Sequence, residues 1–262
     1  MIREFDIDPT APIILLAVAR SGSSLLRSLL TVHPQVRLLE STLIGSLIKA
    51  YPELSNPKPG TTDTLISHAR QSLIDAFYNA SFEDADMGLL HKKCVRQWGF
   101  TVHQIDEPRT LDLLQAGFPN AKWIHLIRDG RAVAASWMDN WKLATGETTT
   151  PNLKLASERW AQSVMNVENG PKHHRLKLED LTSTKKRDPT FKALMNYLKI
   201  DISPRQEAFL ESWPAINTSR KAKNLSKRVF SDAQRSVFQS SSSLEKALVF
   251  FAYGDNFEAE HQ

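Results

Sequence analysis

The chain has 262 residues, of which 41% are hydrophobic and 24% charged, as in an ordinary globular protein. Its single cysteine, Cys94, excludes an intrachain disulfide and fits a reducing compartment. The net charge of +4 favours anionic ligands only weakly. The apolar stretch 13–19 is too short to span a membrane, which takes about 20 residues. We therefore expect one soluble, cytoplasmic domain over residues 1–262.

The first expected unit is a strand, a tight polar turn and a helix. Residues 12–19 (PIILLAVA) form a continuous apolar run, which is typical of a strand buried on both faces. The turn RSGSS follows, and leucines then recur at helical spacing over residues 25–30. Pro34 disfavours helical backbone at the residue before it and so ends the helix.

Further strands and helices alternate along the chain. The sequence predicts helices over 62–79, 108–117 (capped by Asp106), 131–141 and 153–168, strands over 121–128 and 175–181, and helix starts at 188–189, 203–206 and 242–245. Residues 35–60 are expected to be irregular. This alternation predicts an α/β fold with a P-loop-like central parallel sheet flanked by helices on both faces.

The turn at residues 17–24 (AVARSGSS) partly matches the P-loop pattern G-x-x-x-x-G-K-[ST]. Gly22 and Ser24 match, whereas Ala17 replaces the first glycine and Ser23 replaces the lysine. Backbone N–H groups at this helix start would face an anion, and the guanidinium of Arg20 would donate charged hydrogen bonds to the same anion. Without the lysine that reaches a γ-phosphate, the loop favours a 5′-phosphate with a short extension. The alternative is a turn whose serines merely cap the helix.

A second polar motif, RDGRAVAAS, follows the strand predicted at 121–128. Arg128 ends this strand, and Ser136 lies about two helical turns further on. Ligands of open α/β sheets bind at the carboxyl ends of strands, where both motifs are expected. An ion pair between Arg128 and Asp129 at a helix start is the alternative, but it does not account for both motifs together.

The segments ARSGSSLLRSLLTVHPQV and WIHLIRDGRAVAAS resemble the 5′-phosphosulfate loop and the 3′-phosphate site of the PAPS-dependent sulfotransferase superfamily. The resemblance is closest to its bacterial and tyrosylprotein-type branch. It implies in-line transfer of a sulfuryl group from PAPS (3′-phosphoadenosine 5′-phosphosulfate) to an acceptor hydroxyl or amine, with release of PAP and no metal. It assigns the 5′-phosphosulfate to Arg20, Ser21, Gly22, Ser23 and Ser24, and the 3′-phosphate to Arg128 and Ser136.

The resemblance also suggests catalytic residues. Glu40 is the candidate general base, one place before the family's usual glutamate position, and another acid or a histidine could serve instead. Lys92, with Lys93 as its alternative, resembles the lysine of a K-T-P segment and would stabilise developing charge together with Arg20. Lys221, in the basic stretch RKAKNLSKR, would cover the 3′-phosphate. Each of these side chains could equally be a solvated surface charge.

Three other functions remain open at this point. A P-loop kinase or nucleotide hydrolase would need the missing lysine. A non-catalytic nucleotide- or nucleic-acid-binding module would use the basic stretch at 220–228, but no nucleic-acid-binding signature accompanies it, and we expect no such partner. Because Glu40 lies one position before the usual glutamate, a sulfotransferase-like protein that has lost its activity is also an alternative. His91, Cys94 and His103 lack a complete ligand set, so no metal is expected. The acceptor class and the oligomeric state follow from no motif.

Overall fold

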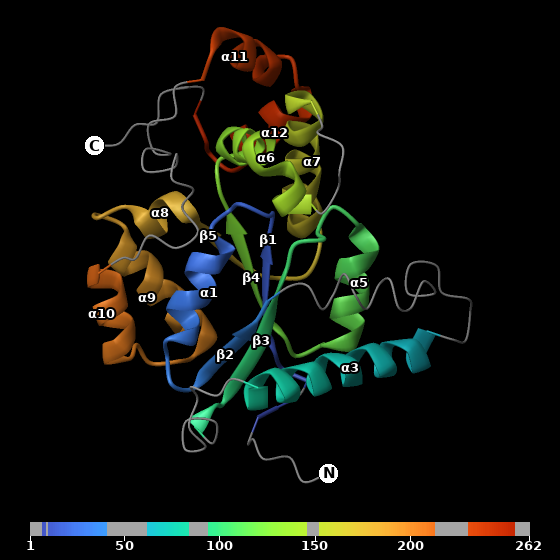
Figure 1. The fold of residues 1–262 in the computed structure, drawn as a ribbon, viewed down its shortest axis with the longest axis vertical. Helices are drawn as coiled ribbons and strands as arrows, with labels where there is room; N and C mark the ends of the chain where they lie inside the picture. The colour runs from blue at the N-terminus through green and yellow to red at the C-terminus, as the bar shows by residue number, and fades with distance from the viewer. Residues whose placement is uncertain are drawn as a thin grey trace.

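The computed structural model describes residues 7–8, 10–40, 62–83, 94–145, 152–212 and 230–254. Its centre is a parallel sheet with the strand order β2-β3-β1-β4-β5 (Figure 1). The strands are β1 (Ile13–Ala17), β2 (Val36–Leu39), β3 (Gln97–Val102), β4 (Lys122–Ile127) and β5 (His174–Lys177). The chain runs from β1 out to β2, returns to β3 and then continues on the other side of β1. The predicted α/β fold with a P-loop-like sheet is thus confirmed.

Helices cover both faces of this sheet (Figure 1). They are α1 (Ser23–Thr31), α3 (Thr62–Glu83), α5 (Pro108–Gly117), α6 (Gly130–Thr145), α7 (Leu153–Glu168), α8 (Leu178–Thr182), α9 (Arg187–Leu198), α10 (Pro204–Ser212), α11 (Asp232–Gln239) and α12 (Ser242–Phe250). In the described part of the chain, no helix has both the length and the apolar character that crossing a bilayer requires.

The alternation of β1 side chains creates two separate cores. Ile13 and Leu15 pack with residues of α1, α9 and α10, whereas Ile14 and Leu16 face residues of α5, α6 and α7. All four side chains are fully buried. Each such burial contributes about 1.5–3 kcal/mol, so the apolar run of the sequence fixes β1 in the middle of the protein.

Several boundaries differ from those predicted. The strand expected over 175–181 ends at Lys177, and the next residues form α8. The cap of α5 is Glu107, whose carboxylate accepts a hydrogen bond from the backbone N–H of Arg109 at 3.3 Å. Asp106 instead pairs with Arg159. Strand β2 lies inside the segment expected to be irregular, because four residues are too few to show a clear strand period.

Candidate functional site

Each of the five strands is followed by a polar or charged side chain at its carboxyl end. These residues are Arg20 after β1, Glu40 after β2, His103 after β3, Arg128 after β4 and Glu179 after β5. Because the strands are parallel, all five ends meet at one edge of the sheet. The strand order reverses at β1, and this is where ligands of open α/β sheets bind.

The loop after β1 has the backbone shape of an anion site. Arg20 and Gly22 both have left-handed backbone conformations, with φ of 72° and 89°. Gly22 is the N-cap of α1 and no side chain caps this helix, which leaves the positive end of its dipole open. The hydroxyl of Ser21 is buried and has no hydrogen-bond partner among the described residues. An open helix start and a spare hydroxyl fit a phosphate or sulfate group.

Gly22 is required here for two independent reasons. Its φ of 89° is strained for any residue with a side chain. A Cβ atom would also lie 2.7 Å from Cδ1 of Leu178, at the start of α8. The loop therefore packs directly on the segment that follows β5.

Three hydrogen bonds join the two predicted motifs. The Nε of Arg20 donates to the hydroxyl of Ser136 at 3.2 Å, and Nη1 of Arg128 donates to the carbonyl oxygen of Arg20 at 2.9 Å. The indole N–H of Trp137 donates to the carbonyl oxygen of Ala19 at 2.9 Å. The residues of each pair are more than 100 positions apart in the chain. The predicted site residues of the two motifs are thus brought together at one place.

Arg128 lies beside a buried carboxylate that the sequence did not connect to it. Glu179 accepts hydrogen bonds from the backbone N–H of Asp129 and from the hydroxyl of Tyr253, each at 2.9 Å. Burial raises the pKa of Glu179, and burial also lowers the pKa of Arg128, which the negative charges of Glu179 and Asp129 partly offset. Tyr253 carries no local motif and was missed, because its role depends on a contact 74 residues away.

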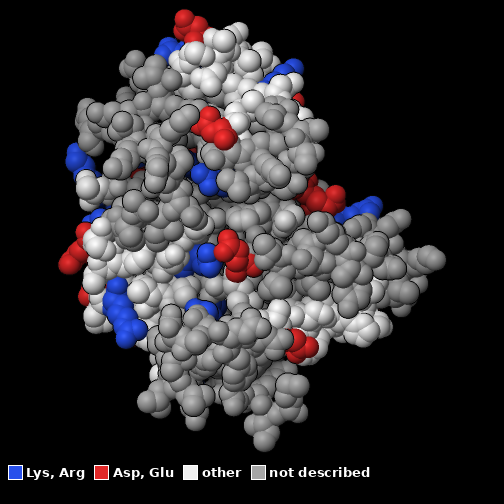
Figure 2. Space-filling view, viewed as in Figure 1, with Lys and Arg blue, Asp and Glu red and all other residues white. Residues whose placement is uncertain are grey.

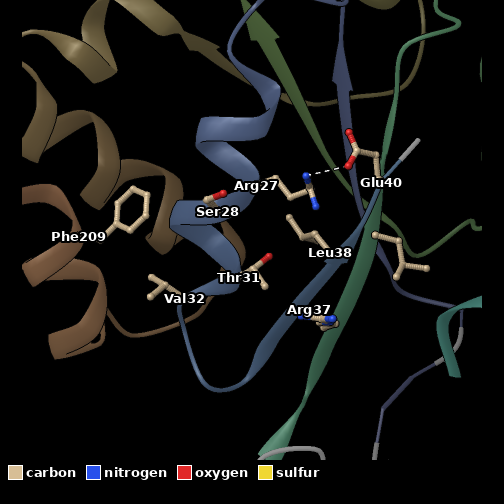
Figure 3. A pocket seen from close by; sticks show the side chains of 9 residues that line it. Arg27, Ser28, Thr31, Val32, Arg37, Leu38, Glu40 and Phe209 are labelled. Atoms are coloured by element: carbon tan, nitrogen blue, oxygen red, sulfur yellow. Dashed lines mark hydrogen bonds and ion pairs between the residues drawn. The ribbon is translucent and has the colours of Figure 1, made fainter. Parts of the chain in front are cut away.

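Glu40 is exposed and already has a partner. Its Oε2 lies 2.9 Å from Nη2 of Arg27, across the gap between the end of β2 and helix α1 (Figure 3). The two side chains line a groove of about 420 Å³ between α1, β2 and α10. This groove is lined by Arg27, Ser28, Thr31, Val32, Arg37, Leu38, Leu39, Glu40 and Phe209. A carboxylate paired in this way is a weaker candidate base than the sequence suggested.

His103 is a base candidate that the sequence analysis considered only as a metal ligand. Its Nδ1 lies 2.7 Å from the carbonyl oxygen of Ala17, the last residue of β1. A carbonyl can only accept, so Nδ1 carries the hydrogen and Nε2 keeps its lone pair. Burial lowers the pKa of His103 below 6.5, while Glu40 raises it and Arg27 lowers it further. The imidazole is therefore neutral at pH 7 and able to accept a proton.

The comparison with protein families decides the identity of the chain. The model described as "Sulfotransferase family" matches residues 12–204, well over half of the sequence. The chain belongs to the sulfotransferase family. The matched region of this sulfotransferase contains all five polar residues at the strand ends, from Arg20 to Glu179, whereas Tyr253 lies beyond it. Membership of this family argues against the alternative functions of a P-loop kinase or nucleotide hydrolase.

Solved sulfotransferase structures share the fold. The sulfotransferase domain of the curacin biosynthetic pathway is 20% identical, with a TM-score of 0.55, and the match covers 93% of this chain and 98% of that one. The sulfotransferase domain of the Synechococcus PCC 7002 olefin synthase is 20% identical, with a TM-score of 0.54 and coverage of 93% and 95%. Mouse sulfotransferase SULT7A1 complexed with PAP is 15% identical, with a TM-score of 0.52 and coverage of 95% and 91%.

The remaining predicted residues of this sulfotransferase lie outside the described part of the chain. Lys92, Lys93, Lys221 and the basic stretch 220–228 belong to this group, so their roles stay predictions. On the face seen in Figure 2, the basic side chains of the described residues lie among acidic ones and form no continuous patch.

Proposed function

We propose that this sulfotransferase transfers a sulfuryl group from PAPS to an acceptor hydroxyl or amine and releases PAP. The observation that carries the proposal is the contact between its two motifs, through Arg20 with Ser136 and Arg128 with the Arg20 carbonyl. PAPS has anionic groups on both sides of its ribose, and two adjoining anion sites suit such a molecule. The PAP complex of mouse SULT7A1 supports the choice of product.

The donor would lie across the carboxyl edge of the sheet. Arg20 and the open start of α1, over residues 21–24, would hold the 5′-phosphosulfate. Arg128 and Ser136 would hold the 3′-phosphate, and Lys221 would close over it. Burial of Arg128 strengthens its attraction for a second phosphate, because a partly desolvated cation is less screened by water, and the carboxylate of Glu179 partly offsets this attraction.

The chemistry is a displacement at sulfur. The acceptor atom forms a bond to sulfur, the bond from sulfur to the 5′-phosphate oxygen breaks, and the acceptor proton passes to a base. We assign this base to His103, whose Nε2 keeps its lone pair because Nδ1 donates to the carbonyl oxygen of Ala17. Glu40, held by Arg27, would stabilise the imidazolium that forms.

Charge develops on the leaving phosphate during this step. Arg20 and Lys92 would stabilise it, so the proposed reaction calls for no metal ion. The single cysteine fits a reaction in the cytoplasm. The acceptor could be a small-molecule alcohol, phenol, sugar, lipid or peptide tyrosine.

Calorimetric titration of the purified protein with PAP, 5′-AMP and ATP–Mg²⁺ tests the donor assignment. PAP and 5′-AMP differ only by the 3′-phosphate, so we expect PAP to bind at least about 10-fold more tightly, as charge-assisted hydrogen bonds require. Transfer of label from ³⁵S-PAPS to a panel of acceptors then tests the reaction. Equal affinity for PAP and 5′-AMP, or preference for ATP–Mg²⁺, would contradict the proposal.

A further inference from the structure

A cluster of two histidines and a glutamate lies outside the residues used above. His125 lies on β4, Glu168 ends α7, and His173 directly precedes β5. Oε1 of Glu168 lies 2.9 Å from Nδ1 of His125 and 3.1 Å from Nε2 of His173. The exposed fractions of these side chains are 0% for His125, 8% for Glu168 and 10% for His173.

One ring nitrogen of His173 faces the carboxylate of Glu168, and the other is used by a carbonyl oxygen. Its Nδ1 lies 2.9 Å from the carbonyl oxygen of Pro171, which can only accept, so Nδ1 carries the hydrogen. In the neutral imidazole, the Nε2 lone pair then points at the lone pairs of Glu168. Two lone pairs at 3.1 Å repel each other unless a positive charge lies between them. The cluster therefore calls for a cation, either a second proton or a metal ion.

We propose that His125, Glu168 and His173 bind one divalent transition-metal ion, with Zn²⁺ as the best match. Two imidazoles and one carboxylate form a common zinc ligand set. Zinc ligands at about 2.0–2.1 Å in a tetrahedron are roughly 3.3 Å apart, close to the two separations that involve Glu168. The three ligand atoms all lie within 4.8 Å of one another.

Around His173 and Glu168, the surroundings have the features of an outer shell around a metal, whereas Nε2 of His125 is buried without a hydrogen-bond partner among the described residues. A histidine that binds a metal usually donates its other N–H to a carbonyl or carboxylate, as His173 does to Pro171. Nη2 of Arg175 contacts Oε2 of Glu168, the oxygen on the far side of the carboxylate, and so turns Oε1 toward the histidines. The guanidinium also lies over the rings of Phe250 and Phe251, with centroids at 5.1 and 5.2 Å.

Arg175 also acts against the metal, because Nε of this side chain lies 3.3 Å from Oε1. Its positive charge weakens the attraction of Glu168 for a cation, which favours an ion with strong imidazole affinity over Ca²⁺ or Mg²⁺. The site would tie the end of α7 to β4 and β5. Its role is thus structural, and it is independent of the proposed sulfuryl transfer.

Titration of the chelator-treated protein with Co²⁺ tests the proposal, because Co²⁺ adopts zinc geometries and absorbs visible light. We expect one equivalent to bind with the spectrum of a tetrahedral or five-coordinate nitrogen–oxygen site, and Zn²⁺ to displace it. The substitution His173→Gln should reduce the affinity at least about 10-fold. The matched control His174→Gln removes the neighbouring histidine, which stacks on Tyr197 instead, and should leave the affinity unchanged.

A second measurement needs no variant. If the site binds zinc, then Zn²⁺ at about 100-fold its Kd should raise the melting temperature of the wild type by about 3 °C or more, and Mg²⁺ should not. Absence of stoichiometric Co²⁺ binding by the wild type would overturn the proposal and leave a proton as the cation of the cluster. Binding that His173→Gln and His174→Gln affect equally would overturn it as well.

Discussion

Arg128 donates a hydrogen bond from Nη1 to the carbonyl oxygen of Arg20, 2.9 Å away and 108 residues earlier in the chain. One guanidinium thus supports the backbone of the loop after β1 and belongs to the proposed second anion site. Arg20, which provides this carbonyl oxygen, has a left-handed backbone conformation with φ of 72°. Such a conformation costs energy in a residue with a side chain, and it persists at functional sites where the surroundings hold it.

The first prediction concerns Arg128→Gln. If Arg128 binds the 3′-phosphate, PAP affinity should fall by about 10- to 100-fold, the effect of one or two charge-assisted hydrogen bonds, while 5′-AMP affinity stays within about threefold. Calorimetric titration measures both ligands. The control Arg205→Ala removes an exposed arginine of α10 and should change neither affinity. An equal loss for PAP and 5′-AMP would mean that Arg128 acts only through the Arg20 backbone.

The second prediction concerns the base. His103→Ala should lower kcat by about 10²- to 10⁴-fold, the usual contribution of general base catalysis, whereas Glu40→Gln should lower it less. The pKa of His103 lies below 6.5, so the imidazole is neutral above that pH. On the acid side, the rate of the wild type should therefore stay flat through pH 6.5 and fall only at lower pH, where the lowered pKa of His103 lies, and His103→Ala should lose this acid limb. A larger loss in Glu40→Gln would return the role of base to Glu40.

The third prediction concerns Gly22→Ala. The substitution forces φ of 89° on an alanine and places a Cβ atom 2.7 Å from Cδ1 of Leu178, so the backbone is strained and the leucine side chain must move. We expect a loss of about 1–3 kcal/mol in the free energy of unfolding and at least about 10-fold weaker binding of PAP and 5′-AMP alike. Chemical denaturation and calorimetry measure the two effects. Gly254→Ala, where nothing lies within 4 Å of the added Cβ, should leave both unchanged.

The fourth prediction concerns Glu179→Gln. The amide keeps one oxygen but cannot accept from both Asp129 and Tyr253, so one buried donor loses its partner. The expected cost is about 1–3 kcal/mol in the free energy of unfolding, measured by denaturant titration. Asp180→Asn is the control, because Asp180 forms a surface ion pair with Lys186, worth about 0–1 kcal/mol. A cost for Glu179→Gln no larger than that of the control would show that Glu179 does not hold the Arg128 segment.

The sequence by itself determined the central strand and the two motifs. An apolar run can be buried on both faces only at the centre of a sheet, so residues 12–19 indicated β1 without reference to the rest of the chain. The polar turns after residues 17 and 127 then had to lie at the carboxyl edge. Short elements were harder to predict from the sequence. Strand β2 has only four residues, and the strand pattern at 175–181 continues past the end of β5 into α8.

Only the tertiary structure decided which side chains act together. The pairing of Glu40 with Arg27 and the hydrogen bond of His103 to Ala17 are the grounds on which we propose His103 as the base, and neither contact follows from a local pattern. Tyr253 reaches Glu179 because α12 packs on α7. Periodicity reports the burial of a residue within its own element, whereas hydrogen bonds between strand ends depend on the order of the strands. That order is set by the packing of both faces of the sheet at once.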